Sequence, residues 1–132
     1  MIEGTCLCGA IRWRFDGTPE DATACNCTVC RRYGVLWAYD WVDGRISLEG
    51  PATAWSRNPD NPNLEFLFCA TCGCVAAWRA TKPWDCGRTR IAVNLRLADP
   101  NAVADIPLLK FDGLDSFKDL PPGTRRVRDI WF

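Results

Sequence analysis

The sequence predicts an all-β domain, and three observations lead to that prediction. Short segments of alternating or β-branched character recur at fairly regular spacing, with turn residues between them. No segment shows a sustained helical periodicity. The chain has 132 residues, 48% of them hydrophobic, and neither a linker nor an internal repeat. It is therefore expected to fold as one domain over residues 1–132 with a packed core.

The predicted strands show a period-two alternation or a run of aromatic and β-branched residues. In chain order they span residues 10–15, 35–42, 45–49, 53–56, 64–68, 74–78, 90–97 and 108–111. The first alternates apolar and basic residues, and the seventh has the clearest alternation, which indicates a central strand. The second would place Trp37, Tyr39 and Trp41 on one face. Asp43-Gly44 predicts a hairpin turn between the second and third strands.

The segments between these strands are predicted from their turn residues. Residues 30–34 are expected to form a short helical turn. Residues 58–63, which are rich in Asn, Pro and Asp, are predicted to be a loop, as are residues 82–87. Residues 117–122 are expected to be a coil arm. The domain is thus predicted to consist of short antiparallel strands and hairpins.

Seven of the nine cysteines fall into three tight groups. The groups are Cys6 and Cys8, then Cys25, Cys27 and Cys30, then Cys69 and Cys72. Cysteines spaced by one or two residues place their sulfurs a few ångströms apart, which suits a tetrahedral zinc ion with zinc–sulfur bonds of about 2.3 Å. The last group lies between two predicted strands and is followed by Gly73, the layout of a zinc knuckle. The three groups therefore predict two zinc sites.

A disulfide framework is the alternative interpretation of a cysteine-rich chain. Three features weigh against it: the number of cysteines is odd, their spacings are those of metal knuckles, and the N-terminal residues show no export signal. We therefore expect reduced, metal-binding cysteines and a cytoplasmic location.

Counting ligands divides the seven cysteines into two sites of different kind. The outer two groups together supply four thiolates, and such a closed site leaves no room for substrate and indicates a structural metal. The middle group supplies three thiolates and leaves a fourth position open, which is typical of a catalytic metal. Three thiolates donate strongly to the metal, which favours chemistry at sulfur over hydrolysis. The structural ligands would be Cys6, Cys8, Cys69 and Cys72, and the catalytic ones Cys25, Cys27 and Cys30.

The alternative is that all three groups are architectural, with the fourth ligand of the middle site supplied by Cys74, Cys86 or a carboxylate. The chain contains no histidine, so every metal ligand must be a thiolate, a carboxylate or water. For the same reason no Ser-His or Cys-His catalytic pair can form.

The charge balance and hydropathy exclude two classes of partner. Sixteen basic and sixteen acidic residues cancel, which speaks against a protein that binds nucleic acid by neutralising phosphates. The densest basic run, residues 125–128, lies next to Asp129 and is interpreted as a solvated face. No run approaches the 18 consecutive apolar residues of a membrane span. We expect no nucleic-acid and no membrane partner.

Three motifs of the chain resemble those of a known family. They are Gly4-Thr5-Cys6-Leu7-Cys8-Gly9-Ala10-Ile11-Arg12-Trp13, Cys25-Asn26-Cys27-Thr28-Val29-Cys30-Arg31-Arg32 and Phe68-Cys69-Ala70-Thr71-Cys72-Gly73. In order, internal spacing and flanking residues they are similar to the glutathione-dependent formaldehyde-activating enzymes, also called the centromere-protein-V type. The resemblance covers positions 4 to 78 and continues more weakly through residues 94–100.

The resemblance implies a β-tent fold, a carbon–sulfur lyase activity and two zinc ions, with the same division of ligands. The founding activity of the family joins formaldehyde to glutathione, giving S-(hydroxymethyl)glutathione, so a small thiol such as glutathione and an aldehyde are the expected partners. The chain departs from the family at Asn26, where many relatives have histidine, and at Cys74, where serine is common. No residue of the chain matches a known glutathione-binding position.

Two hypotheses of function follow from the sequence. The first is a cytoplasmic zinc enzyme of the carbon–sulfur lyase type, which acts on the adduct of a thiol such as glutathione. The second is a non-catalytic zinc-bound β module that binds a protein or another macromolecule. The two differ in whether the middle site keeps an open coordination position.

Overall fold

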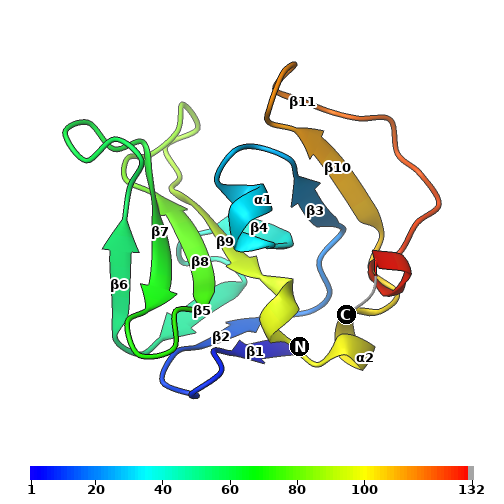
Figure 1. Ribbon diagram of the computed structural model, residues 1–132, viewed down its shortest axis with the longest axis horizontal. Coiled ribbons are helices and arrows are strands. Elements are labelled where there is room, and N and C mark those ends of the chain that lie inside the picture. Colours follow the sequence, from blue (N-terminus) through cyan, green and yellow to red (C-terminus); the bar gives the residue numbers. More distant parts are fainter. Residues whose placement is uncertain (131–132) are drawn as a thin grey trace.

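The computed structural model describes residues 1–130, and its regular elements are mainly short strands in two sheets (Figure 1). The smaller sheet contains, in spatial order, β1 (Ile2–Thr5), β2 (Arg12–Phe15) and β5 (Ile46–Glu49). The larger sheet contains, again in spatial order, β11 (Lys118–Asp119), β10 (Leu108–Asp112), β3 (Ala22–Cys25), β4 (Trp37–Trp41), β9 (Arg90–Asn94), β8 (Val75–Ala80), β7 (Leu64–Cys69) and β6 (Ala52–Trp55). This architecture confirms the predicted all-β fold class.

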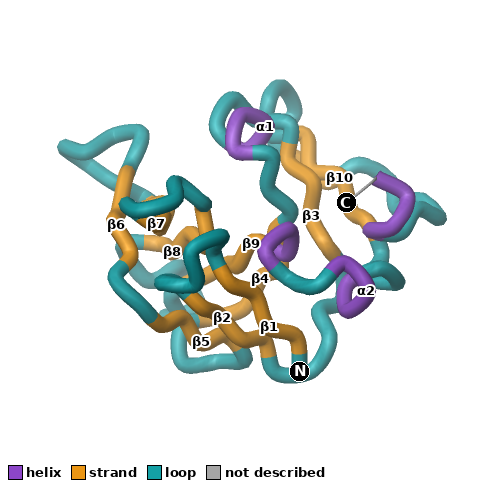
Figure 2. Tube along the Cα trace, turned by 60° about the horizontal axis from the view of Figure 1, so that its bottom comes forward, coloured by secondary structure: helices purple, strands orange, loops and turns teal. Residues whose placement is uncertain are grey.

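The helical elements of the described chain are single turns in the connections between strands (Figure 2). They are α1 (Cys30–Tyr33), α2 (Pro100–Val103), η1 (Leu95–Leu97) and η2 (Val127–Ile130). α1 is the helical turn predicted over residues 30–34, and Gly34 ends it in the left-handed conformation with a φ of 63°. Among residues 1–130, no helix has the length and apolar character needed to span a bilayer.

Each of the eight predicted strands is present, with ends displaced by at most three residues. The largest displacement is at β9, where the chain turns into η1 instead of continuing the strand to residue 97. The sequence pattern does not reveal β1, β3 or β11, whose two to four residues are mainly small or charged and include no run of aromatic or β-branched residues. β11 lies within the segment predicted to be a coil arm.

The predicted hairpin at Asp43-Gly44 is wrong, although a tight turn is present. The Gly44 N–H donates to the Trp41 carbonyl at 2.9 Å, and Asp43 adopts a φ of 63°. β4 pairs with β3 and β9, while β5 pairs with β2 of the other sheet. Turn residues set the local reversal of the chain but not the pairing partner, so here the turn carries the chain from one sheet to the other.

One strand pair departs from the predicted antiparallel arrangement. β10 runs parallel to β3, with Phe111 opposite Cys25, whereas the other described strand pairs are antiparallel. The two strands are separated by more than eighty residues, so no hairpin constrains their direction.

The larger sheet separates two hydrophobic clusters. The first joins buried side chains of the smaller sheet, including Trp13 and Phe15, to Leu67, Ile91 and Val93 of the larger sheet. Neighbouring strand residues point to opposite faces, so Ala92 belongs to the second cluster on the other face. The buried members of the second cluster are Cys30, Val35, Trp37, Phe66, Val75, Trp78, Ala80 and Ala92.

A partly buried ion pair crosses the turn between the sheets. Arg45 Nε lies 2.5 Å from Asp40 Oδ2, and Asp40 is only 8% exposed. Burial disfavours the charged carboxylate, but the hydrogen bonds from Arg45 and the Trp41 N–H outweigh this effect and hold the pKa of Asp40 below its usual value. The carboxylate therefore depends on Arg45.

Arg45→Met should lower the free energy of unfolding by about 1–2 kcal/mol near pH 7, because it leaves a buried carboxylate without its cation. Methionine keeps an apolar contact with Phe15, over whose ring the guanidinium lies. Urea denaturation measures the effect. The control is Arg14→Met, which breaks an exposed pair with Glu3 and should cost less than about 1 kcal/mol. Equal losses in the two variants would contradict this account.

Candidate metal centres

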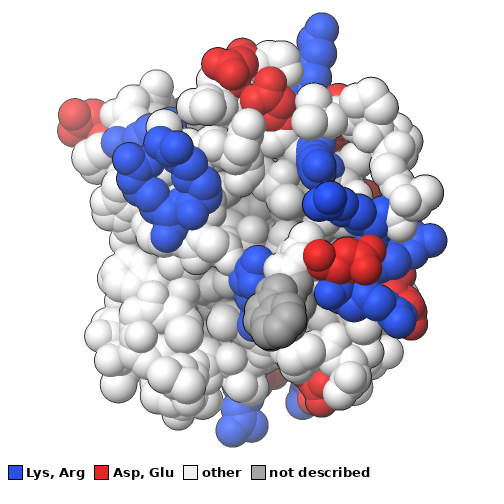
Figure 3. All heavy atoms as spheres, turned by 45° about the vertical axis from the view of Figure 1, so that its right-hand side comes forward, with Lys and Arg blue, Asp and Glu red and all other residues white. Residues whose placement is uncertain are grey.

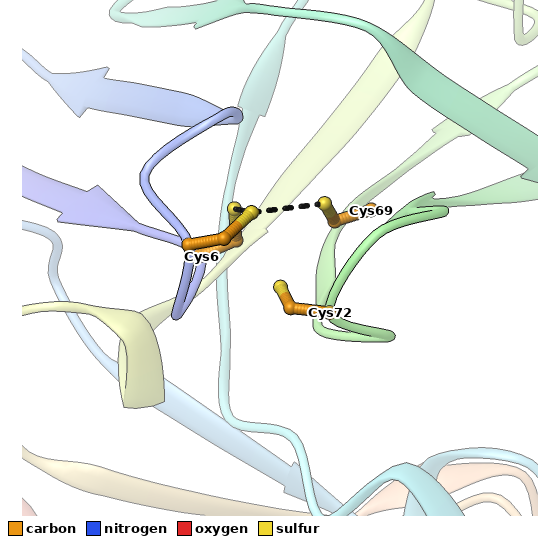
Figure 4. A group of neighbouring side chains, drawn as sticks. Cys6, Cys69 and Cys72 are labelled. Atoms are coloured by element: carbon orange, nitrogen blue, oxygen red, sulfur yellow. Dashed lines mark hydrogen bonds between the residues drawn. The ribbon is translucent and has the colours of Figure 1, made fainter.

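The first and third cysteine groups meet in space as one four-thiol group. Cys6 and Cys8 lie in the turn between β1 and β2, while Cys69 ends β7 and Cys72 lies in the turn before β8. Cys8 Sγ is 3.6 Å from Cys6 Sγ and 3.5 Å from Cys69 Sγ, and all four sulfurs lie within 4.8 Å of one another. Figure 4 shows the sulfurs of Cys6, Cys69 and Cys72 directed toward a common centre.

Backbone N–H groups surround these sulfurs. The Ile11 N–H donates to Cys6 Sγ at 3.2 Å. The Cys74 and Cys8 N–H groups donate to Cys72 and lower the pKa of its thiol to about 6. Gly73 has a φ of 77°, the left-handed conformation that the knuckle turn needs and that glycine adopts without strain. These donors favour the thiolate at Cys72, the form in which cysteine binds metal, while hydrogen bonding to the neighbouring thiols raises the pKa of Cys8.

The middle group forms a second, three-thiol group. Cys25 ends β3, Cys27 lies in the following turn, and Cys30 begins α1, so one short stretch of chain supplies all three sulfurs. The Cys27 N–H donates to Cys25 Sγ at 3.4 Å, and the Cys30 N–H donates to Cys27 Sγ at 3.3 Å. The Trp37 indole N–H donates to Cys30 Sγ at 3.3 Å.

Two of these thiols have opposed pKa shifts. The Cys30 thiol donates to Cys25, and this hydrogen bond, assisted by the Cys27 N–H, lowers the pKa of Cys25 to about 6 despite its burial. The same hydrogen bond and burial raise the pKa of Cys30. One proton is thus shared within a compact group that already favours a thiolate at neutral pH.

No fourth ligand of the usual types joins the three-thiol group. Within residues 1–130, no further cysteine or carboxylate has a ligand atom close to all three sulfurs. Cys74 packs against the first hydrophobic cluster, beside the four-thiol group, and Cys86 is exposed in the loop before β9. The alternative ligands considered from sequence therefore lie elsewhere.

A loop that the sequence did not associate with the metal sites lies against the three-thiol group. This cap loop, residues 112–117, connects β10 to β11. The Asn26 amide donates to Asp112 Oδ1 at 3.1 Å and accepts the Leu114 N–H at 3.0 Å. A Cβ added to Gly113 would lie 2.8 Å from Cys25 Sγ and 2.9 Å from Cys27 Cβ. Only a glycine lets the backbone approach the thiols this closely.

Asp112 gives the cap loop its shape. Its carboxylate accepts the N–H groups of Ser116 and Asp115 and the Ser116 hydroxyl, and with the Asn26 amide these hydrogen bonds lower the pKa of Asp112 well below its usual value. No sequence motif marks this arrangement, because Asn26 and Asp112 are far apart in the chain.

The two thiol groups lie on opposite faces of the larger sheet. Cys6 and Cys69 belong to the first hydrophobic cluster, and Cys30 belongs to the second. Tyr39 shares the second face, and burial raises the pKa of its phenol, with Cys30 and Cys25 adding to the rise and Arg90 opposing it. Tyr39 is thus within electrostatic range of both the three-thiol group and Arg90.

Two surface hollows lie away from the three-thiol group. One is on the smaller sheet, lined by residues such as Glu3, Arg12 and Glu49. The other lies where β5 faces the larger sheet, lined by Leu48 and Ile91 among others. Figure 3 shows a group of basic side chains at upper left, and basic and acidic side chains side by side at right.

Comparison with known proteins assigns this arrangement to a family. A family model described as glutathione-dependent formaldehyde-activating enzyme matches residues 1–104, which include all seven grouped cysteines. The chain belongs to the glutathione-dependent formaldehyde-activating enzyme family. The resemblance found from the three cysteine motifs is thereby confirmed. No curated protein matches the chain significantly.

A solved structure supports the fold of this family member. The crystal structure of a Rhodobacter sphaeroides protein, a structural-genomics target, has a TM-score of 0.59 and 22% sequence identity. The alignment covers 80% of this chain and 98% of the other. At this level of identity the likeness concerns the fold alone.

The donor sets of this family member fit zinc. A tetrahedral zinc ion with bonds of about 2.3 Å separates its sulfur ligands by about 3.8 Å, close to the 3.5 and 3.6 Å measured in the four-thiol group. Both groups consist only of cysteine sulfur, the ligand that structural zinc sites favour. Each of the two groups could therefore hold one zinc ion.

Gly113→Ala should weaken zinc binding at the three-thiol group roughly 10- to 100-fold, the range seen when outer contacts of metal ligands are disturbed. The added methyl group would push the cap loop away from Cys25 and Cys27. Competition with a chromogenic chelator measures the affinity.

The matched control is Gly123→Ala, because a Cβ there meets no atom within 4 Å and neither glycine has a left-handed backbone. Equal zinc affinities in the two variants would show that the cap loop does not support the thiols.

Proposed function

We propose that this protein is a zinc-dependent enzyme of the carbon–sulfur lyase type, acting on glutathione and formaldehyde. The four-thiol group would hold a structural zinc, and Cys25, Cys27 and Cys30 would hold the catalytic one. In the synthetic direction the thiol sulfur bonds to the aldehyde carbon, the carbonyl π bond breaks, and the thiol proton ends on the new hydroxyl. Nothing is oxidised or reduced. A cytoplasmic location is part of this proposal.

One observation carries the proposal: three thiols converge on the sheet face opposite the closed group, and no other cysteine or carboxylate of residues 1–130 joins them. An ion held by three side chains keeps a position for substrate, whereas an ion held by four does not. Zinc bound there would supply a Lewis acid that holds the substrate thiolate or polarises the aldehyde oxygen.

The surrounding residues prepare the three-thiol group for exchange of a sulfur ligand. The Trp37 indole N–H and two backbone N–H groups donate to the cysteine sulfurs, which spreads their negative charge. Cys25 and Cys27 are only half-buried although Gly113 of the cap loop packs against both, so part of their side stays open to a small thiol. The aromatic second cluster excludes water from the opposite side.

The rival function, a zinc-bound module that binds a macromolecule, is favoured by one observation. Neither of the two described hollows is lined by Cys25, Cys27 or Cys30. Activity measurements on variants of the two thiol groups separate the two functions.

Cys27→Ser should reduce formation of S-(hydroxymethyl)glutathione by about 100-fold or more, because it removes a metal ligand and not merely an outer contact. The fold should persist, since the four-thiol group is intact. NMR exchange between formaldehyde and its glutathione adduct measures the rate above the uncatalysed reaction, and circular dichroism checks the fold.

Cys86→Ser is the matched control, because this exposed thiol belongs to neither group, and it should behave as wild type. Unchanged turnover in Cys27→Ser would contradict the catalytic role of the three-thiol group and leave the binding module as the better hypothesis.

Chelator titration should remove two zinc ions in separate steps. The ion in the three-thiol group should leave first with the far-ultraviolet circular dichroism unchanged, because three ligands from one short stretch hold no distant elements together. Removal of the second should unfold the chain, because that ion joins two knuckles. Native mass spectrometry counts the ions at each step, and simultaneous loss of both would contradict two sites of different kind.

A further inference from the structure

A group of stacked aromatic and arginine side chains lies at the end of β4. This arginine shelf consists of Trp41, Trp84, Arg88 and Arg90. The Arg90 guanidinium lies 4.7 Å from the Trp41 ring centre, 5.8 Å from that of Trp84 and 5.2 Å from that of Tyr39. Arg88 lies 4.8 Å from the Trp41 ring centre. Trp84 meets Trp41 edge-to-face and is 52% exposed, so the shelf opens to solvent.

The charges of the shelf have no protein partner. Within residues 1–130, no carboxylate lies at ion-pair distance from the guanidinium of Arg88 or Arg90, although Arg45 and Arg79 both have one. Asp21, whose pKa responds weakly to Arg90, accepts a hydrogen bond from Thr23 instead. Stacking occupies the flat faces of a guanidinium and leaves its N–H edge free for a bidentate carboxylate.

β4 connects the shelf to the three-thiol group. Trp37, Tyr39 and Trp41 alternate along the strand and share its second face. Trp37 contacts Cys30, and Trp41 lies opposite Arg90 in the neighbouring strand β9. From Trp37 to Trp41 the strand advances by four residues, or about 13 Å. The Arg90 guanidinium lies over the Tyr39 ring, so it is nearer to the three-thiol group than Trp41 is. In glutathione the γ-glutamyl carboxylate is eight bonds from the sulfur, so an extended molecule places the two about 10 Å apart.

We propose that Arg90, assisted by Arg88, binds a carboxylate of the thiol substrate while its sulfur occupies the three-thiol group. The inference rests on the proposed function for the identity of that substrate, glutathione. Between the two points lies Tyr39, which is half-buried, whereas Trp37 is buried in the second cluster. The shelf thus selects thiols that carry a carboxylate at the correct distance from sulfur.

Two arginines near the three-thiol group are already engaged. Arg57 donates to the Thr28 hydroxyl at 2.6 Å, and Arg32 donates to the Thr28 carbonyl at 2.7 Å. Both therefore support the turn that carries the cysteines. The shelf differs from them in having guanidinium groups that stack on aromatic rings and make no ion pair among the described residues.

Binding of S-methylglutathione to the zinc-loaded protein tests the shelf directly, because this probe keeps both carboxylates but has no free thiol. Isothermal titration calorimetry should show roughly 10- to 100-fold weaker binding to Arg90→Gln than to wild type, the loss of a charged hydrogen-bonded pair. Arg88→Gln, at an exposed position, should weaken binding less. The diethyl ester of S-methylglutathione should bind wild type and Arg90→Gln equally.

The matched control is Arg79→Gln. Arg79 lies opposite Ile91 in the same sheet, so its side chain is on the other face, where it pairs with Glu65. This variant should bind the probe as wild type does. Equal binding by wild type and Arg90→Gln, or a loss confined to Arg57→Gln, would overturn the proposal.

Kinetics separate this inference from the proposed function. With formaldehyde, Arg90→Gln should raise the KM for glutathione roughly 10- to 100-fold and leave that for 2-mercaptoethanol unchanged. If Arg90→Gln turns over with an unchanged KM for glutathione, the carboxylate-binding role of the shelf is wrong and the proposed function is unaffected. Absence of turnover in wild type, with probe binding still dependent on Arg90, would overturn the function and support the shelf.

Discussion

The convergence of four thiols is the constraint on which the rest of the fold depends. Cys8 and Cys69 are 61 positions apart, and their contact joins the smaller sheet to the hairpin of β7 and β8. A zinc ion held by the four thiols would crosslink a loop of this length and lower the entropy of the unfolded chain by an amount worth on the order of 4 kcal/mol. For a domain of 132 residues that is a large share of the total stability.

Placing the two thiol groups on opposite faces of one sheet separates stability from chemistry. The four-thiol group is continuous with the first cluster, which includes the largest buried side chains of the smaller sheet, Trp13 and Phe15. The three-thiol group borders the second cluster and keeps two half-buried sulfurs. Under the proposed function, ligand exchange on the second face would not disturb the contacts that hold the sheets together.

The sequence predicts what short-range patterns encode. Alternation located β9 and the β7–β8 hairpin, and cysteine spacing identified the three clusters of thiols. Both signals depend on residues a few positions apart. The pairing of β4 and β5 failed because Asp43-Gly44 encodes a turn and not a partner strand. The arginine shelf could not be predicted from the sequence either, because Arg90 contacts Trp41 only through the pairing of β4 with β9.

The parallel pairing of β3 and β10 explains how the cap loop reaches the three-thiol group. Parallel strands end at the same edge of a sheet, and the register sets Phe111 opposite Cys25. The next residues along the two strands, Asp112 and Asn26, then meet through their side chains, and Gly113 follows beside Cys27. An antiparallel pairing would have carried the same loop to the opposite edge. The direction of one strand, which no local pattern encodes, thus decides which backbone lies against the cysteines.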